Sequence, residues 1–253
     1  MQPEQQYLQA HFYDLLDSSR VDGADASVRF FLSYALRAGD ALELGAGTGR
    51  VALAIARQHT PVWAVEPSPA MRAACLVKVA QQPHLHPFFT LLPGSAQEVR
   101  INRTFRFIYA AGVSTHWIND KQWIAVLKNV ARHLADDGIF VVDNLCLTPP
   151  DRQDSPLTRV GQARIGEMEY RTYFGKTWID ERRYRFQARY EVVYRGNVIE
   201  SYEDDSIGSF LCQETCSQLL KEVGLQVRAT YQDYSFSRVS ETAQQVILEA
   251  VRS

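Results

Sequence analysis

The chain has 253 residues, of which 46% are hydrophobic and 22% are charged, and its formal net charge at pH 7 is -2. This length suits one α/β domain with an insertion, and the composition is that of an ordinary globular protein. The sequence has no basic block and no apolar run of transmembrane length, so nothing favours a nucleic-acid or membrane partner. We therefore expect a single domain spanning residues 1–253.

The N-terminus and the cysteines indicate a cytoplasmic protein. Residues 1–6 are polar and lack the apolar segment of a signal peptide. Cys212 and Cys216 are four residues apart, but no second pair completes a zinc site, and Cys75 and Cys146 lie far from both in the sequence. We expect four free thiols in a reducing compartment and no bound metal.

Strands and helices alternate between residues 39 and 148, which predicts a parallel, Rossmann-like, doubly wound sheet. Ahead of this core, helical patterning over residues 7–17 and 26–36 predicts a helical cap at residues 1–38. The strands expected in the core are Ala41–Leu44, Val62–Glu66, 87–92, Phe105–Ala110 and 139–142, and the expected helices are 51–56, Pro69–Ala80 and 120–134.

The pattern changes after the fifth strand, where a proline-rich loop begins. From about residue 163 to 209 the sequence is strand-like, and residues 183–194 alternate with period two, which predicts an antiparallel hairpin with one buried face. Gly175-Lys176 and Arg195-Gly196-Asn197 are its turn signals. We assign residues 149–210 to this antiparallel insertion. Residues 211–253 then supply the last helix and two closing strands, which bring the main sheet to seven strands.

A glycine-rich turn joins the first strand to its helix. It reads Gly45-Ala46-Gly47-Thr48-Gly49, and glycine permits both unusual backbone angles and close approach of a ligand. The second strand ends in Glu66, 17 residues after Gly49, at what we expect to be an exposed strand end. A carboxylate at that place accepts hydrogen bonds from both hydroxyls of a ribose. The sequence therefore predicts an adenosine-type ligand.

The glycine pattern alone leaves NAD open as that ligand. NAD sites show G-x-G-x-x-G/A, which fails at Arg50 in the frame from Gly45 but reaches Ala52 in the frame from Gly47. Glu43 beside the turn argues against NAD, because a carboxylate there would repel a pyrophosphate. S-adenosylmethionine carries a sulfonium and an amino-acid end instead, and it tolerates an acid at this position.

Glu43 with the glycine turn, and Glu66-Pro67-Ser68-Pro69-Ala70-Met71 after the second strand, resemble the first two motifs of the class I S-adenosylmethionine-dependent methyltransferases. Tyr13-Asp14-Leu15-Leu16 with Arg20, the hairpin insertion and Tyr202-Glu203-Asp204-Asp205-Ser206-Ile207 resemble the amino-sugar N,N-dimethyltransferases and, more distantly, glycine N-methyltransferase. Two departures stand out: Asp17 replaces a frequent aromatic residue, and Ser95 replaces a frequent acid near the adenine amine.

The resemblance implies an enzyme that transfers a methyl group from S-adenosylmethionine to a small-molecule acceptor, an amine above all. It leaves the possibility of a homodimer. The residues that it places around the cofactor are Glu43, Gly45, Ala46, Gly47, Gly49, Glu66, Pro67, Met71, Ser95, Ala96, Gln97 and Ala111. A small-molecule O-methyltransferase and a non-catalytic, cofactor-binding partner subunit remain as alternatives.

His116 and Tyr13 are the candidate catalytic residues. His116 follows the fourth strand at its carboxyl end, where open α/β sheets bind ligands, and an imidazole can act as a base near neutral pH. Tyr13 could close over the acceptor from the N-terminal helix; a core-facing aromatic residue is an equally good interpretation. For Trp117 and Trp123, packing is the better interpretation.

Two further features have competing interpretations. Asp143-Asn144 resembles the magnesium-binding pair of catechol-type O-methyltransferases, but residues 108–112 lack the second carboxylate that such a site needs. The chain is therefore predicted to be metal-independent.

Arg183, Arg185 and Arg189 share one strand face, where they could attract an acidic acceptor, although a solvated face is the better interpretation.

Overall fold

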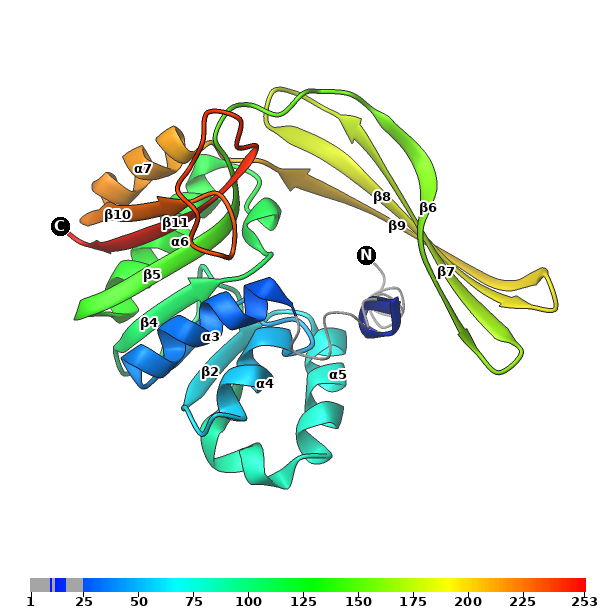
Figure 1. Ribbon diagram of the computed structural model, residues 1–253, viewed down its shortest axis with the longest axis horizontal. Coiled ribbons are helices and arrows are strands. Elements are labelled where there is room, and N and C mark those ends of the chain that lie inside the picture. Colours follow the sequence, from blue (N-terminus) through cyan, green and yellow to red (C-terminus); the bar gives the residue numbers. More distant parts are fainter. Residues whose placement is uncertain (1–9, 11, 17–24) are drawn as a thin grey trace.

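The computed structural model describes residues 10, 12–16 and 25–253, and these form two sheets (Figure 1). The larger sheet has seven strands in the order β10-β11-β5-β4-β1-β2-β3. Its strands are β1 (Ala41–Leu44), β2 (Val62–Glu66), β3 (Phe89–Pro93), β4 (Phe105–Ala110), β5 (Leu134–Cys146), β10 (Leu225–Tyr231) and β11 (Gln245–Arg252). The helices around it are α3 (Ala26–Ala38), α4 (Arg50–Ala56), α5 (Pro69–Ala80), α6 (Asp120–His133) and α7 (Gln213–Glu222), with 3-10 turns η1 (Pro83–Phe88) and η2 (Ser114–His116).

The pairing of the strands confirms the predicted doubly wound fold. Strand β1 pairs in parallel with β2 and β4, β2 pairs with β3, and β4 pairs with β5. Only β11 runs antiparallel to its neighbours, β5 and β10. Because the parallel strands all point the same way, their carboxyl ends meet at one edge of the sheet, where such folds bind ligands.

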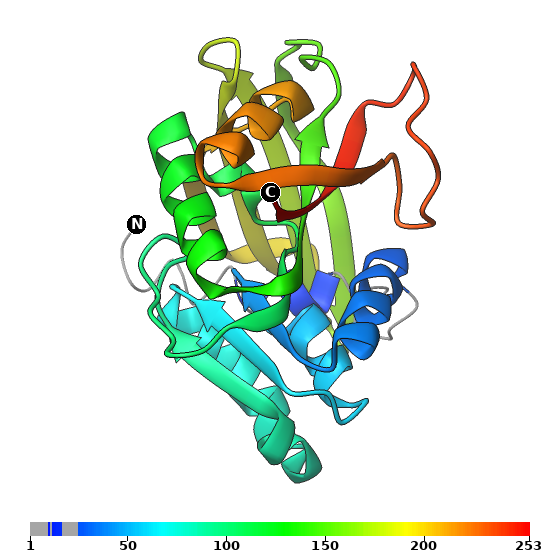
Figure 2. The ribbon, with the colours of Figure 1, turned by 90° about the vertical axis from the view of Figure 1, so that its left-hand side faces the viewer.

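Helices cover both faces of the large sheet (Figure 2). Buried residues of α6 and α7, such as Trp123 and Leu220, pack on one face, and those of α3 and α4, such as Phe31 and Ile55, pack on the other. Both faces of the central strands are therefore shielded from solvent, which explains why the sequences of β1 and β4 are mostly apolar.

The insertion is a four-stranded sheet in the order β6-β7-β8-β9, built from β6 (Ser155–Ile165), β7 (Met168–Trp178), β8 (Arg183–Tyr194) and β9 (Asn197–Ser209). The expected turn at Gly175-Lys176 is wrong: both residues lie inside β7, opposite Gln187 and Phe186. A Cβ at Gly175 would come within 3.0 Å of the Leu157 backbone nitrogen, so this glycine allows β6 to approach closely. The actual turns lie at residues 166–167, 179–182 and 195–196.

The two faces of the insertion differ in chemistry. Asp204 and Tyr202 are cross-strand partners of Ala188 and Tyr190 and share their face, which we call the inner face because it packs on the N-terminal helix. The three arginines of β8 point to the outer face, where each has an acidic partner: Arg183 with Asp180 at 2.6 Å, Arg185 with Asp205 at 3.3 Å and Arg189 with Glu203 at 2.9 Å. This pairing favours the interpretation of the outer face as a solvated, salt-bridged surface and argues against an acceptor site there.

Other boundaries differ modestly from expectation. Residues 135–138, which lie between the expected helix at 120–134 and the expected strand at 139–142, belong to β5, whose register with β4 shifts between Phe105 and Phe107. The expected helix at 7–17 lies partly outside the described residues, as do Asp17 and Arg20. Within the described part of the chain, no helix combines the length and hydrophobicity needed to cross a bilayer.

Candidate functional site

The glycine turn lies at the carboxyl ends of β1 and β2. The backbone N–H groups of Gly45 and Ala46 donate to the Val65 carbonyl at 2.8 and 3.0 Å, which holds the turn against β2. Gly45 and Gly47 have φ values of 79° and 56°, in the left-handed region that favours glycine. A Cβ at Gly45 would lie 2.5 Å from a Val113 methyl carbon, whereas one at Gly47 would meet no atom within 4 Å. The turn is therefore packed on one side and open at Gly47.

Glu66 is bound to this turn and is only 6% exposed, so the predicted exposed position is wrong. One carboxylate oxygen accepts from the Gly47 N–H at 2.7 Å, and the other accepts from the Ser68 N–H at 2.8 Å. Burial raises the pKa of Glu66, and these two N–H groups act in the opposite direction. Because each carboxylate oxygen has two lone pairs, both oxygens remain able to accept further hydrogen bonds.

Glu43 is the second acid of the turn, and it is buried beneath it. Its carboxylate accepts from the Ala52 N–H at 3.1 Å, in the first turn of α4. Burial raises the pKa of Glu43 to about 8, although nearby Tyr109 and Arg50 favour the charged form. A cation bound beside Glu43 would favour its ionised form, and an anion bound there would favour its neutral form.

A cavity of about 430 Å³ opens over the turn. It is lined by eleven of the twelve predicted cofactor residues and by both predicted catalytic residues: Glu43, Gly45, Ala46, Gly47, Glu66, Pro67, Met71, Ser95, Ala96, Gln97, Ala111, Tyr13 and His116. Gly49 does not line it. Instead, a Cβ at Gly49 would lie 2.7 Å from the Cys75 sulfur, so Gly49 serves the packing of α4 on α5.

Arg50 also lines the cavity, although it was not among the predicted site residues. Its guanidinium donates to Asp25 at 2.7 Å and to the Ser27 hydroxyl at 2.6 Å, at the start of α3. The sequence signal for Arg50 is its place directly after the glycine turn, where it also breaks the NAD pattern in the frame from Gly45. Arg50 is the one guanidinium that lines the cavity among the described residues.

The N-terminal helix joins the glycine turn to the insertion. Asp14 accepts from the Thr48 hydroxyl at 2.8 Å and pairs with Lys78 of α5 at 2.9 Å. Phe12 packs on the inner face of the insertion, with ring centroids 5.8 Å from Tyr170 and 5.0 Å from Tyr190. Figure 1 shows this helix, in dark blue, between the two sheets. These contacts place Tyr13, which is 39% exposed, at the wall of the cavity.

His116 ends the 3-10 turn η2 after β4, and it faces the insertion as well as the cavity. Burial lowers the pKa of His116, while the negative charge of Asp204 on β9 raises it. Asp204 is 9% exposed on the inner face, and it was not among the predicted site residues. Its position could be found only from the strand register, since a single carboxylate in a strand carries no spacing signal.

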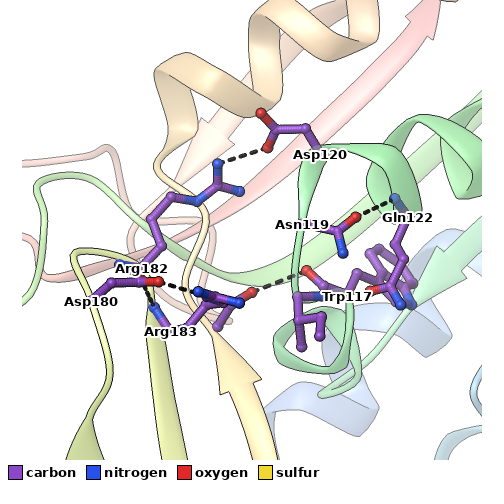
Figure 3. Close-up of polar contacts among 9 residues, drawn as sticks. Trp117, Asn119, Asp120, Gln122, Asp180, Arg182 and Arg183 are labelled. Atoms are coloured by element: carbon purple, nitrogen blue, oxygen red, sulfur yellow. Dashed lines mark hydrogen bonds and ion pairs between the residues drawn. The ribbon is translucent and has the colours of Figure 1, made fainter.

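Polar contacts fix the insertion to this part of the core (Figure 3). The Ser209 hydroxyl donates to the Trp117 carbonyl at 3.0 Å, next to His116. Arg182, in the turn between β7 and β8, donates to Asp120 at the start of α6 at 2.7 Å. Trp117 and Trp123 pack edge to face with centroids 4.6 Å apart, which agrees with their packing interpretation, although Trp117 also touches the cavity.

Both carboxylate oxygens of Asp143 are hydrogen-bonded to other parts of the protein. One carboxylate oxygen accepts from the Gly112 N–H at 2.7 Å, and the other accepts from the Tyr234 hydroxyl at 2.7 Å. It thus joins the loop after β4 to the segment after β10. Within residues 10, 12–16 and 25–253, no group of three or more His, Cys, Asp or Glu side chains is arranged to hold a metal ion.

Comparisons with known proteins agree with this geometry. Residues 41–138, which contain the glycine turn and Glu66, match the sequence profile of a family described as a methyltransferase domain. This part of the chain resembles a methyltransferase domain. No curated protein sequence gives a significant match to the chain.

Solved structures show the same fold over nearly the whole chain. An S-adenosylmethionine-dependent methyltransferase from Clostridium acetobutylicum superposes with a TM-score of 0.77 at 20% identity, covering 96% of this chain and 97% of that one. DesVI from Streptomyces venezuelae gives a TM-score of 0.75 at 19% identity, covering 97% and 98%. The sugar N-methyltransferase KedS8 from Streptoalloteichus gives 0.72 at 17% identity, covering 95% and 93%. The insertion is therefore part of the shared architecture.

The residues that line the cavity fit S-adenosylmethionine, the cofactor of the methyltransferase from Clostridium acetobutylicum. The open position at Gly47 leaves room for the ligand to approach the backbone, and Glu66 retains acceptor positions for a ribose diol. Ser95, which replaces the acid often found near adenine, lines the cavity and donates to Glu98 at 3.3 Å. The carboxylate of Glu98 is thus hydrogen-bonded to Ser95, at the position where an acid is often found.

Proposed function

We propose that the chain transfers the methyl group of S-adenosylmethionine to the nitrogen of a small-molecule amine. The observation that carries the proposal is the single cavity that brings Glu66 and the glycine turn together with His116 beneath the inner face of the insertion. Solved structures of the same fold include an amino pentose methyltransferase and a sugar N-methyltransferase, which makes amino sugars the first acceptors to test.

The cofactor supplies the electrophilic methyl group, and the residues of the chain supply position and charge. Glu66 would hold the ribose, and Glu43 would favour the positive end of the ligand. An amine acceptor arrives as an ammonium ion and must lose a proton before it can attack. His116, kept neutral by burial, would accept that proton, and Asp204 would stabilise the imidazolium that results.

The insertion and the N-terminal helix would enclose the acceptor. The inner face presents aromatic residues together with Lys176, whose ammonium lies 5.0 Å from the centre of the Trp178 ring and 5.5 Å from that of Tyr184. No carboxylate of the described residues pairs with Lys176 in the way that acids pair with the outer arginines. An acceptor that carries an anionic group as well as an amine would therefore find a cation on this face.

A panel of acceptors tests the proposal. Purified protein with S-adenosylmethionine would be offered amino sugars, with and without a phosphate, alongside the matching hydroxyl sugars, and release of S-adenosylhomocysteine would be measured. We expect turnover with amines and none with the hydroxyl analogues. Turnover on hydroxyl sugars alone would favour the O-methyltransferase alternative. Tight cofactor binding with no turnover on any acceptor would favour a partner subunit.

Replacing His116 by Asn should lower turnover by about tenfold, less than the loss of an obligatory base, because a bound amine can also lose its proton to water. Cofactor affinity should stay nearly unchanged, since the base acts on the acceptor. Turnover of the wild type should fall as the pH drops, because protonated His116 cannot accept a proton. The pH profile and the cofactor dissociation constant of both proteins check this. Equal turnover at every pH would remove His116 from the mechanism.

Methyl transfer should need no added metal, because Asp143 is occupied by Gly112 and Tyr234 and the loop after β4 offers no second carboxylate. Assays with and without a chelator measure this directly. We expect equal rates. Loss of activity with the chelator, followed by recovery with magnesium, would contradict the expectation and support catechol-type chemistry.

A further inference from the structure

The insertion leaves the methyltransferase core and returns to it at two adjacent cysteines. Cys146 is the last residue of β5, just before the chain enters the insertion, and Cys212 is the N-cap of α7, just after the chain leaves it. The two residues form an isolated parallel β-bridge, and the Cys146 N–H donates to the Leu211 carbonyl at 3.1 Å. Bridged neighbours lie about 4.8 Å apart, within the Cα separation that a disulfide spans.

The two thiols already touch. Their sulfur atoms are 2.9 Å apart, and either thiol can be the hydrogen-bond donor. Cys146 is buried, and Cys212 is partly exposed. The other two cysteines, Cys75 and Cys216, are completely buried, at 0% exposure. Among the described residues, Cys146 and Cys212 are the two cysteines whose thiols contact each other.

We propose that Cys146 and Cys212 form a reversible disulfide that clasps the two ends of the insertion together. The oxidant is a small-molecule disulfide such as oxidised glutathione. The Cys212 thiolate attacks it to give a mixed disulfide and releases one reduced glutathione. The Cys146 thiolate then attacks the Cys212 sulfur and releases the second. In total, one glutathione disulfide is reduced to two thiols while the two cysteine thiols lose their protons and become one disulfide.

The surroundings set the order of these steps. Burial and the hydrogen bond with Cys212 raise the pKa of Cys146 to about 12, and nearby Arg182 partly offsets this. Cys212, the partly exposed thiol of the pair, therefore reacts first. Once Cys212 is capped, it can no longer repel a Cys146 thiolate, and Arg182 still favours that thiolate. Arg182 is also the residue that ties the insertion to Asp120 (Figure 3).

The clasp would restrain the sheet that covers the acceptor side of the cavity. Residues 147–211 would form a closed covalent loop, while the glycine turn and Glu66 would keep their contacts. Such a link stabilises the folded protein chiefly by restricting the unfolded chain. For a loop of this length we expect the midpoint of thermal unfolding to rise by about 5–10 °C on oxidation, with unchanged affinity for S-adenosylmethionine.

Mass spectrometry of the full chain tests the proposal without any acceptor or cofactor. The protein is equilibrated with mixtures of oxidised and reduced glutathione, its free thiols are alkylated, and the peptides are mapped. We expect one disulfide, between Cys146 and Cys212, which dithiothreitol reverses. The Cys146→Ser variant should stop at a glutathione adduct on Cys212, and the Cys212→Ser variant should form neither product. Cys75→Ser is the matched control and should behave as wild type.

The wild-type peptide map decides the question even if a variant folds poorly. Full alkylation of both cysteines under oxidising conditions, or a disulfide with a different pairing, would overturn the proposal. Cofactor titration of the same samples separates this outcome from failure of the proposed function, because the clasp forms whether or not methyl transfer is observed.

Discussion

Replacing Glu66 by Ala should weaken binding of S-adenosylmethionine by about 10- to 150-fold, which corresponds to about 1.5–3 kcal/mol for a lost charge-assisted, two-point contact. The variant should also be less stable than wild type, because the backbone N–H groups of Gly47 and Ser68 lose their acceptor. Titration calorimetry gives the affinity, and thermal unfolding gives the stability. We expect both the cofactor affinity and the thermal stability of the variant to be lower than those of wild type.

Two variants separate the ribose contact from general damage at this site. Glu66→Gln keeps the shape and one acceptor oxygen but lacks the charge, so its affinity should lie between those of wild type and Glu66→Ala. Glu222→Ala removes an exposed acid at the end of α7 that does not line the cavity, and this variant should bind S-adenosylmethionine as wild type does. An unchanged dissociation constant in Glu66→Ala would mean that the ribose lies elsewhere.

Replacing Gly47 by Ala should weaken cofactor binding by a similar factor for a different reason. The added Cβ meets no protein atom within 4 Å, so it would project into the space left for the ligand. Overfilling such a site costs about 1–3 kcal/mol, or about 5- to 150-fold in affinity. The cofactor affinity of the folded variant, measured by calorimetry, checks this.

Gly39→Ala is the matched control for backbone strain. Gly39 ends α3 with φ 83°, and a Cβ added there would also meet no atom within 4 Å, but Gly39 lies away from the cavity. Both variants place alanine in the left-handed region, which costs about 1 kcal/mol of stability. Only Gly47→Ala should lose affinity. Equal loss in both would attribute the effect to strain.

The sequence predicted the seven-stranded core and most of the cavity lining because both depend on local patterns. The glycine turn and Glu66 lie within one strand–helix–strand unit, so their spacing defines their geometry. Gly49 is instructive: it belongs to the same motif, yet its role is to let α4 pack against Cys75. The motif therefore identifies the turn, but it does not distinguish glycines that face the ligand from glycines that allow close packing.

The remaining features depend on contacts between distant segments. The charge of Asp204 acts on His116 only because of the register of β8 with β9 and the docking of the insertion on the core. Arg50 is held by Asp25, the N-cap of α3, and by Ser27 in its first turn, and nothing in the sequence around Arg50 indicates this. Gly175 was mistaken for a turn because a glycine that admits a neighbouring strand looks the same in sequence as one that reverses the chain.

Titration of the wild-type protein with S-adenosylmethionine, S-adenosylhomocysteine and NAD tests the central claim most directly, since each ligand has an adenosine and they differ in what is attached to it. Glu43 and Glu66 beside the turn should admit the sulfonium ligand and its demethylated product and oppose a pyrophosphate. We predict that both methionine-derived ligands bind with dissociation constants about 100-fold or more below that of NAD. Binding of NAD with equal or higher affinity would contradict the account.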